Sequence, residues 1–209
     1  MTPLLLLDYS GVAVFAATGA LAASRKQLDI VGFLFLSVVT GIGGGTVRDV
    51  ILDAPVFWLT SSGYVLVCVV AGITVYFTAH RLESRYRLLL WLDAVGMAAY
   101  AVVGAAKGLA LTGSPVVAVI TGILTATFGG ILRDVLTNEP SVLLRPEIYV
   151  TAALAGSLTY IAVDLGGAPL VSAGAAFLVA FIVRGGALWF GWSIPVYRSR
   201  PGRRPEDIP

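Results

Sequence analysis

The chain repeats itself at an offset of 85 residues, and this duplication constrains its fold more than any other feature. LDYSGVAVFAATGA, from Leu7, aligns with LDAVGMAAYAVVGA, from Leu92. TGIGGGTVRDVILDAP, which ends at Pro55, aligns at the same offset with TATFGGILRDVLTNEP, which ends at Pro140. Chance matches between apolar segments would favour Leu, Val and Ala, whereas most of these matches are Gly, Asp, Arg and Pro. The chain therefore contains an internal duplication.

Seven apolar segments follow one another, each near the roughly 20 residues that a helix needs to cross a bilayer. They lie at about 4–24, 30–52, 60–79, 88–110, 115–137, 147–165 and 169–190. Charged residues make up 12% of the chain, about half the fraction usual in soluble domains, and the mean hydropathy is +0.89. Because the apolar runs are continuous rather than alternating, they favour helices over a β-barrel. We expect an all-α integral membrane protein with seven transmembrane helices.

The duplication predicts how these helices are arranged. Each repeat, about 4–80 and about 88–165, holds three helices, so the second repeat enters the membrane from the opposite side. Such inverted repeats recur in transport proteins. The seventh helix, about 169–190, and a basic tail, 198–209, lie outside the repeats. The connections are short, so we expect one membrane domain over residues 1–209.

The basic residues predict the orientation in the cell (inner) membrane. Under the seven-helix count, ten of them fall on one side: Arg25, Lys26, Arg81, Arg85, Arg87, Arg145, Arg198, Arg200, Arg203 and Arg204. Cytoplasmic loops carry an excess of Lys and Arg. We therefore expect a multi-pass protein whose N-terminus is outside and whose C-terminus is cytoplasmic.

Several functional classes are excluded by composition. The single Cys68 and the single His80 cannot build a Cys/His metal cluster, a disulfide framework or a Cys-His nucleophile pair within one chain. The net charge of +2 is too small to argue for nucleic acid. We expect no enzyme, no cofactor and no nucleic-acid partner.

Adjacent glycines interrupt the second and fifth helices: Gly43, Gly44, Gly45, Gly129 and Gly130. Close packing of membrane helices explains isolated glycines well. A run of glycines, however, occupies different faces and makes a helix easy to kink or unwind. Irregular backbone at membrane depth is tolerated only inside protein or beside a watery cavity. We predict a functional break in both helices, where opened carbonyls could replace part of a cation's hydration shell.

An Arg-Asp pair follows the glycines by three residues in each repeat: Arg48-Asp49 and Arg133-Asp134. Ionisable groups at this depth are costly and indicate function. Neighbours at i and i+1 do not face each other on a helix, so each Arg needs another partner. We predict that Arg48 pairs with Asp8 and Arg133 with Asp93, one pair towards each mouth. Whether these pairs line a pore or staple helices together stays open.

Four hydroxyl side chains lie on the approach to the glycines: Ser37, Thr40, Thr121 and Thr125. Each can bond back to a carbonyl of its own helix, but their concentration on these two helices favours a hydrophilic lining. Lys107 is a lone cation towards the outer end of the fourth helix. We expect it to snorkel to the interface, with a place near a pore mouth as the alternative.

The doubled pattern GG-x-x-RD-x-x-x-x-x-P, in two three-helix repeats followed by a seventh helix, resembles the prokaryotic TRIC (trimeric intracellular cation) channels. Bacterial and archaeal members of that family are also labelled as a glycine-transporter-type domain. The motifs are GGGTVRDVILDAP and GGILRDVLTNEP, and the resemblance extends to about Trp192. Phe128 departs from the duplication, because it occupies the position of Gly43 and could narrow one side of the path.

The resemblance implies a homotrimer in which each protomer holds its own pore between the repeats. It implies kinks at the glycines, pore or pore-adjacent roles for the Arg-Asp pairs, and passive conduction of monovalent cations, chiefly K⁺, with no resident metal. Membrane lipids are the other expected partners. Inverted repeats with broken helices describe transporters equally well, so a secondary transporter of a small solute such as glycine is the alternative.

Overall fold

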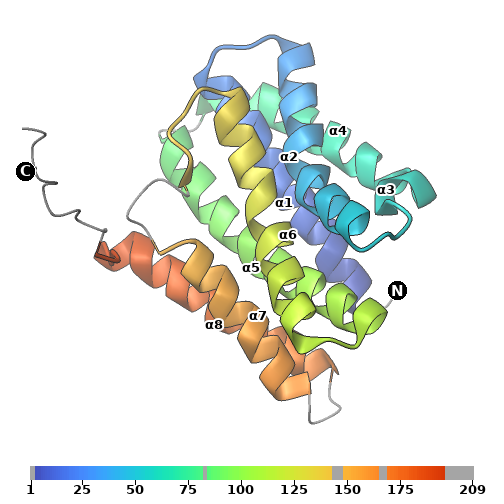
Figure 1. Cartoon of the computed structure of the whole chain (residues 1–209). Coiled ribbons are helices and arrows are strands. Elements are labelled where there is room, and N and C mark those ends of the chain that lie inside the picture. Colours follow the sequence, from blue (N-terminus) through green and yellow to red (C-terminus); the bar gives the residue numbers. More distant parts are fainter. Residues whose placement is uncertain (1–2, 82–83, 143–147, 165–168, 196–209) are drawn as a thin grey trace, which may run out of the picture.

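The computed structural model describes residues 3–81, 84–142, 148–164 and 169–195, and these are almost entirely helical (Figure 1). The α-helices are α1 (Pro3–Arg25), α2 (Ile30–Ile51), α3 (Phe57–Thr60), α4 (Gly63–Thr78), α5 (Arg85–Thr112), α6 (Pro115–Leu136), α7 (Val150–Asp164) and α8 (Pro169–Phe190). Six of them are long and apolar enough to cross a membrane, and α7 is a shorter apolar helix. The predicted all-helical membrane fold is confirmed.

The predicted segments match the observed helices with two differences. The one expected at about 147–165 forms a helix of only 15 residues, Val150–Asp164. The short α3 precedes α4 as a separate turn, so the third span begins at Gly63. Arg145 and the tail 198–209 lie outside the described residues.

Helices α2 and α6 begin and end in the same way, because their boundary residues are related by the 85-residue offset. Asp29 caps α2 by accepting a hydrogen bond from Gly32 N, and Ser114 caps α6 from the equivalent position. Such side chains satisfy amide groups that the first helical turn leaves free. Asp53 and Asn138, at φ 50° and 51°, follow the helix ends in the left-handed region.

The two glycine-bearing helices cross in contact and antiparallel. A methyl group added at Gly44 would overlap the carbonyl oxygen of Thr125, and one added at Gly129 would lie 2.6 Å from the carbonyl oxygen of Thr40. These are the same contact repeated at the offset, with each helix supplying one glycine and one carbonyl. Small residues let helix backbones approach closely in this way.

Helices α1 and α5 cross by the same rule. Gly11 lies against the ring of Tyr100, and Gly96 lies against the ring of Phe15, so the two contacts are again related by the offset. Each helix supplies one glycine and one aromatic ring, and both contacts can form only if the helices are antiparallel, as expected for inverted repeats. Val12, Phe15 and Tyr100 belong to the main buried cluster at this crossing.

The remaining helices cover this four-helix centre. α4 packs against α1 and α2, while α7 packs against α5, α6 and α8. α8, which has no counterpart in the repeats, lies beside α5 and α7 on one flank of the bundle (Figure 1). Large apolar side chains such as Val31, Leu66 and Ile182 are exposed on the outer faces, as lipid contact requires.

Candidate functional site

The glycine runs do not break their helices. α2 is continuous α-helix from Ile30 to Ile51, and α6 is continuous from Pro115 to Leu136. The helices are therefore not unwound at residues 43–45 and 129–130 in this conformation, and the kinks and the functional role of these glycines stay predictions. The absence of a side chain allows close packing at Gly44 and Gly129, because a methyl group there would meet a backbone carbonyl of the opposite helix.

The neighbours of the other three glycines differ in how easily they can move. A methyl group at Gly45 would lie 2.6 Å from the Phe57 ring, and one at Gly130 would lie 2.9 Å from the Tyr149 hydroxyl. At Gly43 the only near atom is the end of the Leu132 side chain. Of the five glycines, Gly43 is thus the position that can most easily accept a side chain. Its counterpart in the second repeat, Phe128, does carry one and is half-buried.

Arg48 and Asp49 lie buried at the C-terminal end of α2, together with the start of α1 and the end of α5. We call this region the Asp8 end. Arg48 Nε donates to Asp49 Oδ1 at 2.7 Å. Lys107 Nζ donates to the same oxygen at 2.8 Å, and the amide of Phe57 donates to Asp49 Oδ2 at 2.9 Å. One buried carboxylate therefore pairs with two cations, Arg48 and Lys107, and its second oxygen caps the turn before α3.

The predicted pair of Arg48 with Asp8 is wrong. Asp8 Oδ2 accepts a hydrogen bond from the Tyr64 hydroxyl at 2.9 Å, and no ion pair within 4 Å involves Asp8 in the described part of the chain. The argument from helix geometry failed because it considered only where side chains leave the backbone. An arginine side chain is long enough to bend back to the adjacent carboxylate, which its bond to the Phe57 amide holds in place.

Lys107 does more than snorkel. Its side chain is 30% exposed, yet its ammonium reaches the fully buried carboxylate of Asp49. A hollow of about 310 Å³ opens between α1 and α5 at this point, and both Asp8 and Lys107 line it. The alternative position that the sequence left open for Lys107, beside a mouth, agrees with this geometry.

Arg133 occupies the equivalent position at the end of α6, in a region that we call the Asp93 end. Its Nη1 donates to Asp93 Oδ1 at 2.6 Å, which confirms the predicted pair. Nη1 also donates to Thr18 Oγ1 at 3.2 Å, and Nε donates to Asp134 Oδ1 at 3.0 Å. The amide of Val142 donates to Asp134 Oδ2 at 3.0 Å, which is the equivalent of the bond from Phe57 to Asp49 in the first repeat.

The two ends share the contacts of the Arg-Asp pair and differ in the residues around it. Lys107 has Ala22 as its counterpart, and Thr18 has Val103. Both ends hold two buried or partly buried carboxylates. At the Asp8 end Asp49 pairs with two cations and Asp8 bonds to Tyr64, whereas at the Asp93 end both carboxylates pair with one guanidinium. Burying such charges is costly unless they are paired, so each cluster holds its helices firmly together.

The predicted lining hydroxyls lie buried in helix crossings. Thr125 donates to the carbonyl of Thr121 at 2.6 Å, and Thr121 donates to the carbonyl of Gly104 on α5 at 3.1 Å. Thr40 packs against Gly19, and Ser37 packs against Gly72. The structure thus shows packing contacts for all four side chains, and a role in lining a path stays a prediction.

One of these contacts is exchanged between the repeats. In the first repeat Ser37 on α2 packs against Gly72 on α4. In the second repeat Gly122 on α6 packs against Ser157 on α7 at the equivalent place. One serine therefore faces one glycine in both repeats, and the two residues are supplied by opposite helices of the pair.

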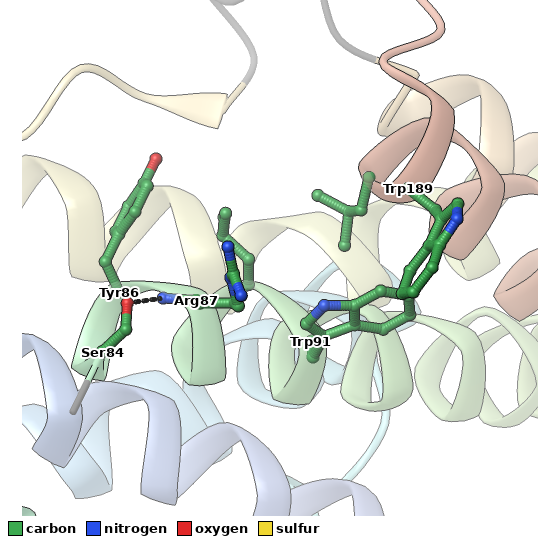
Figure 2. A pocket seen from close by; sticks show the side chains of 7 residues that line it. Ser84, Tyr86, Arg87, Trp91 and Trp189 are labelled. Atoms are coloured by element: carbon green, nitrogen blue, oxygen red, sulfur yellow. Dashed lines mark hydrogen bonds between the residues drawn. The ribbon is translucent and has the colours of Figure 1, made fainter. Parts of the chain in front are cut away.

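A larger hollow lies away from the charged clusters, between the start of α5 and the end of α8. It measures about 560 Å³, and Figure 2 shows Arg87, Trp91 and Trp189 among the side chains that line it. The Trp91 and Trp189 rings lie 6.5 Å apart. One wall of this hollow comes from α8, which lies outside the repeats.

Three contacts were not predicted from the sequence: Lys107 with Asp49, Tyr64 with Asp8, and Thr18 with Arg133. Tyr64 carried a usable signal, because its counterpart Tyr149 falls on the same offset. Thr18 and Lys107 carried none, since each stands where the other repeat has an apolar residue. No group of three His, Cys, Asp or Glu side chains in the described residues is arranged to hold a metal ion.

Comparisons with known proteins agree with this geometry. A family model described as "Glycine transporter" matches residues 5–80 and 90–164. The chain is 36% identical to a UPF0126 membrane protein of Vibrio cholerae over 93% of this chain and 82% of that protein. It is 42% identical to the UPF0126 inner membrane protein YadS of Escherichia coli over 74% of this chain and 75% of YadS.

Solved structures extend the likeness to the whole fold. A TRIC trimeric intracellular cation channel orthologue from Rhodobacter sphaeroides is 49% identical, with a TM-score of 0.89 over 92% of this chain and all of that one. A structure described as concerning conductance through TRIC cation channels is 30% identical, with a TM-score of 0.84 over 96% of this chain and all of that one. The doubled glycine and Arg-Asp motifs, the inverted three-helix repeats and these matches together show that the chain belongs to the prokaryotic TRIC family, which is also described as the glycine-transporter family.

Proposed function

We propose that this protein is a passive channel for monovalent cations, chiefly K⁺, with the path inside each protomer between the two repeats. The observation that carries the proposal is the pair of buried Arg-Asp clusters, one at each end of the α2–α6 crossing. Solved relatives at 49% and 30% identity are described as cation channels, which supports the same role here. Neither the family match nor these relatives point to an enzyme.

The path is closed at the α2–α6 crossing in this conformation, because the backbones of Gly44 and Gly129 touch carbonyl groups of the opposite helix. Conduction between these helices therefore requires them to part. Thr40 and Thr125, which supply those carbonyls, would then present hydroxyl and carbonyl oxygens to a cation. Such oxygens can replace part of the hydration shell of K⁺.

We further propose a homotrimer surrounded by membrane lipids, with the Asp93 end facing the cytoplasm. YadS, a relative, is named as an inner membrane protein, and another relative is described as trimeric. Basic residues collect near the Asp93 end, among them Arg25, Lys26 and Arg85. By the positive-inside rule this places the N-terminus outside and the C-terminus in the cytoplasm.

A secondary transporter of a small solute such as glycine is the second candidate, and the description of the matching family model favours it. Purified protein in a planar bilayer separates the two functions. A channel gives unitary cation currents, whereas a transporter gives saturable counterflow of labelled glycine in proteoliposomes without unitary currents. Silence in the bilayer together with counterflow would overturn the channel proposal.

A further inference from the structure

A partly exposed ion cluster covers the Asp93 end, and among the described residues no ion pair occupies the equivalent place at the Asp8 end. Glu139, just beyond α6, accepts from two cations at the end of α1. Arg25 Nη2 lies 3.4 Å from Glu139 Oε1, and Lys26 Nζ lies 3.1 Å from the same oxygen. The Arg25 guanidinium also lies over the Tyr86 ring, 4.5 Å from its centroid. The cluster therefore links the end of α1 to the segment after α6 and to the start of α5.

Apolar residues stand in the other repeat at the positions of these three charges. The positions equivalent to Arg25, Lys26 and Glu139 are Ala110, Leu111 and Ala54. Both repeats contain the buried Arg-Asp pair, whereas the cluster of Arg25, Lys26 and Glu139, which we call the ionic cover, occurs in only one of them. Packing of the repeat fold therefore does not require it, since the Asp8 end is built without it.

The cover lies directly over the buried charges of the second repeat. Arg25 and Glu139 line a hollow whose other walls include Ala22, Arg133 and Asp134, and the volume inside is only about 10 Å³. That volume holds at most one water molecule. The hollow at the opposite end measures about 310 Å³. In this conformation the hollow beside Arg133 and Asp134 is almost filled, whereas the hollow beside Asp8 and Lys107 is wide.

Glu139 is also joined to the buried cluster through the backbone. Its amide donates to the carbonyl oxygen of Asp134 at 2.9 Å, so a movement of Glu139 acts on the turn that follows the buried Arg-Asp pair. The three side chains of the cover are 22–36% exposed. Exposed ion pairs are individually weak and are screened by salt, so thermal motion can open this cover.

We propose that Arg25, Lys26 and Glu139 form an ionic latch that controls access of water and cations to the Asp93 end. When the latch opens, the Glu139 carboxylate is released beside the entrance to the buried cluster, where its charge attracts cations. The role in conduction rests on the proposed channel function, whereas the closure of the hollow does not. The latch therefore needs a test that works without current.

Chemical labelling of a cysteine inside the hollow provides that test. Ala22→Cys places a thiol in the hollow, and the natural Cys68 is buried elsewhere in the helix packing. In proteoliposomes, Glu139→Gln should increase the rate at which a small cationic thiol reagent modifies Cys at position 22 by several-fold. Raising KCl from 20 to 500 mM should do the same in the intact latch, by screening, and should have little effect in the Glu139→Gln background.

Matched variants guard against a general loosening of the fold. Asp53→Asn removes an exposed carboxylate after α2 and installs the residue that the second repeat has there, Asn138, so the labelling rate should not change. Removing the two cations instead, with Arg25→Gln and Lys26→Gln, should raise the rate as Glu139→Gln does. Equal labelling rates with and without the latch charges would overturn the proposal. Faster labelling without any cation current would uphold the latch and refute the channel.

Discussion

Substitution of single glycines by alanine tests whether the glycine runs serve close packing rather than flexibility. In Gly129→Ala the new methyl group would lie 2.6 Å from the carbonyl oxygen of Thr40, whereas ordinary contacts begin at 3.4 Å. The carbonyl is part of a helix backbone and cannot rotate away, so α2 and α6 must separate by about 0.8 Å. A gap of that size forfeits a quarter to a half of the dispersion energy of the atoms involved. Overpacking of this kind costs about 1–3 kcal/mol.

Thermal unfolding of the purified protein in detergent measures this cost. For a chain of this length, Gly129→Ala and Gly44→Ala should each lower the melting temperature by roughly 2–12 °C. Gly43→Ala meets only the movable end of a leucine side chain and should cost less than about 1 kcal/mol. Gly174→Ala, on the exposed face of α8 with nothing within 4 Å, should be neutral or slightly stabilising because alanine favours helix. If Gly43→Ala proved as damaging as Gly44→Ala, backbone flexibility rather than contact would explain the glycines.

Three further predictions concern the charged ends and the exchanged contact. Asp93→Asn removes one of the two carboxylates that pair with the buried Arg133 guanidinium, and it should lower the free energy of unfolding by about 3–5 kcal/mol. Asp8→Asn breaks no ion pair and should cost less than half of that. Equal losses would refute the assignment of partners. Lys107→Met should lower stability by no more than about 1 kcal/mol, because the lysine is partly exposed and Asp49 keeps its bonds to Arg48 and to the Phe57 amide. A larger loss in urea unfolding would show that the carboxylate depends on Lys107. Gly72→Ser alone should destabilise the fold by about 1–3 kcal/mol, because the new side chain clashes with Ser37. Adding Ser37→Gly should recover most of the loss by recreating the arrangement of the second repeat. Purely additive effects of the two substitutions would contradict this.

Much of the fold could be predicted from the sequence because the bilayer and the duplication both leave few choices. Apolar length fixed the spans, and the predicted segment 169–190 coincides with Pro169–Phe190. The odd number of helices per repeat predicted the antiparallel crossings. The pair of Arg133 with Asp93 followed from the same symmetry, since both residues repeat at the offset.

The errors in the candidate site arose where the repeats differ or where contacts between helices decide the outcome. Arg48 was assigned to Asp8 because both were expected on the side where the second helix ends, but Lys107, whose counterpart is Ala22, adds a cation at that end. The glycines were interpreted as weak points because a helix considered alone loses stability there. Within the bundle, the contacts with Thr40 and Thr125 hold the same glycines in continuous helix. Neither outcome depends on local sequence alone.

The most direct test of the proposed function is the reversal potential of the purified protein in a planar bilayer under a tenfold KCl gradient. A cation-selective channel should show unitary currents that reverse at up to about 59 mV in magnitude, with the sign set by K⁺. Replacing Asp93 with asparagine should alter the unitary conductance, because one carboxylate of the proposed path is lost. Currents that reverse near 0 mV, or on the chloride side, would contradict the account, as would the absence of unitary currents from folded protein.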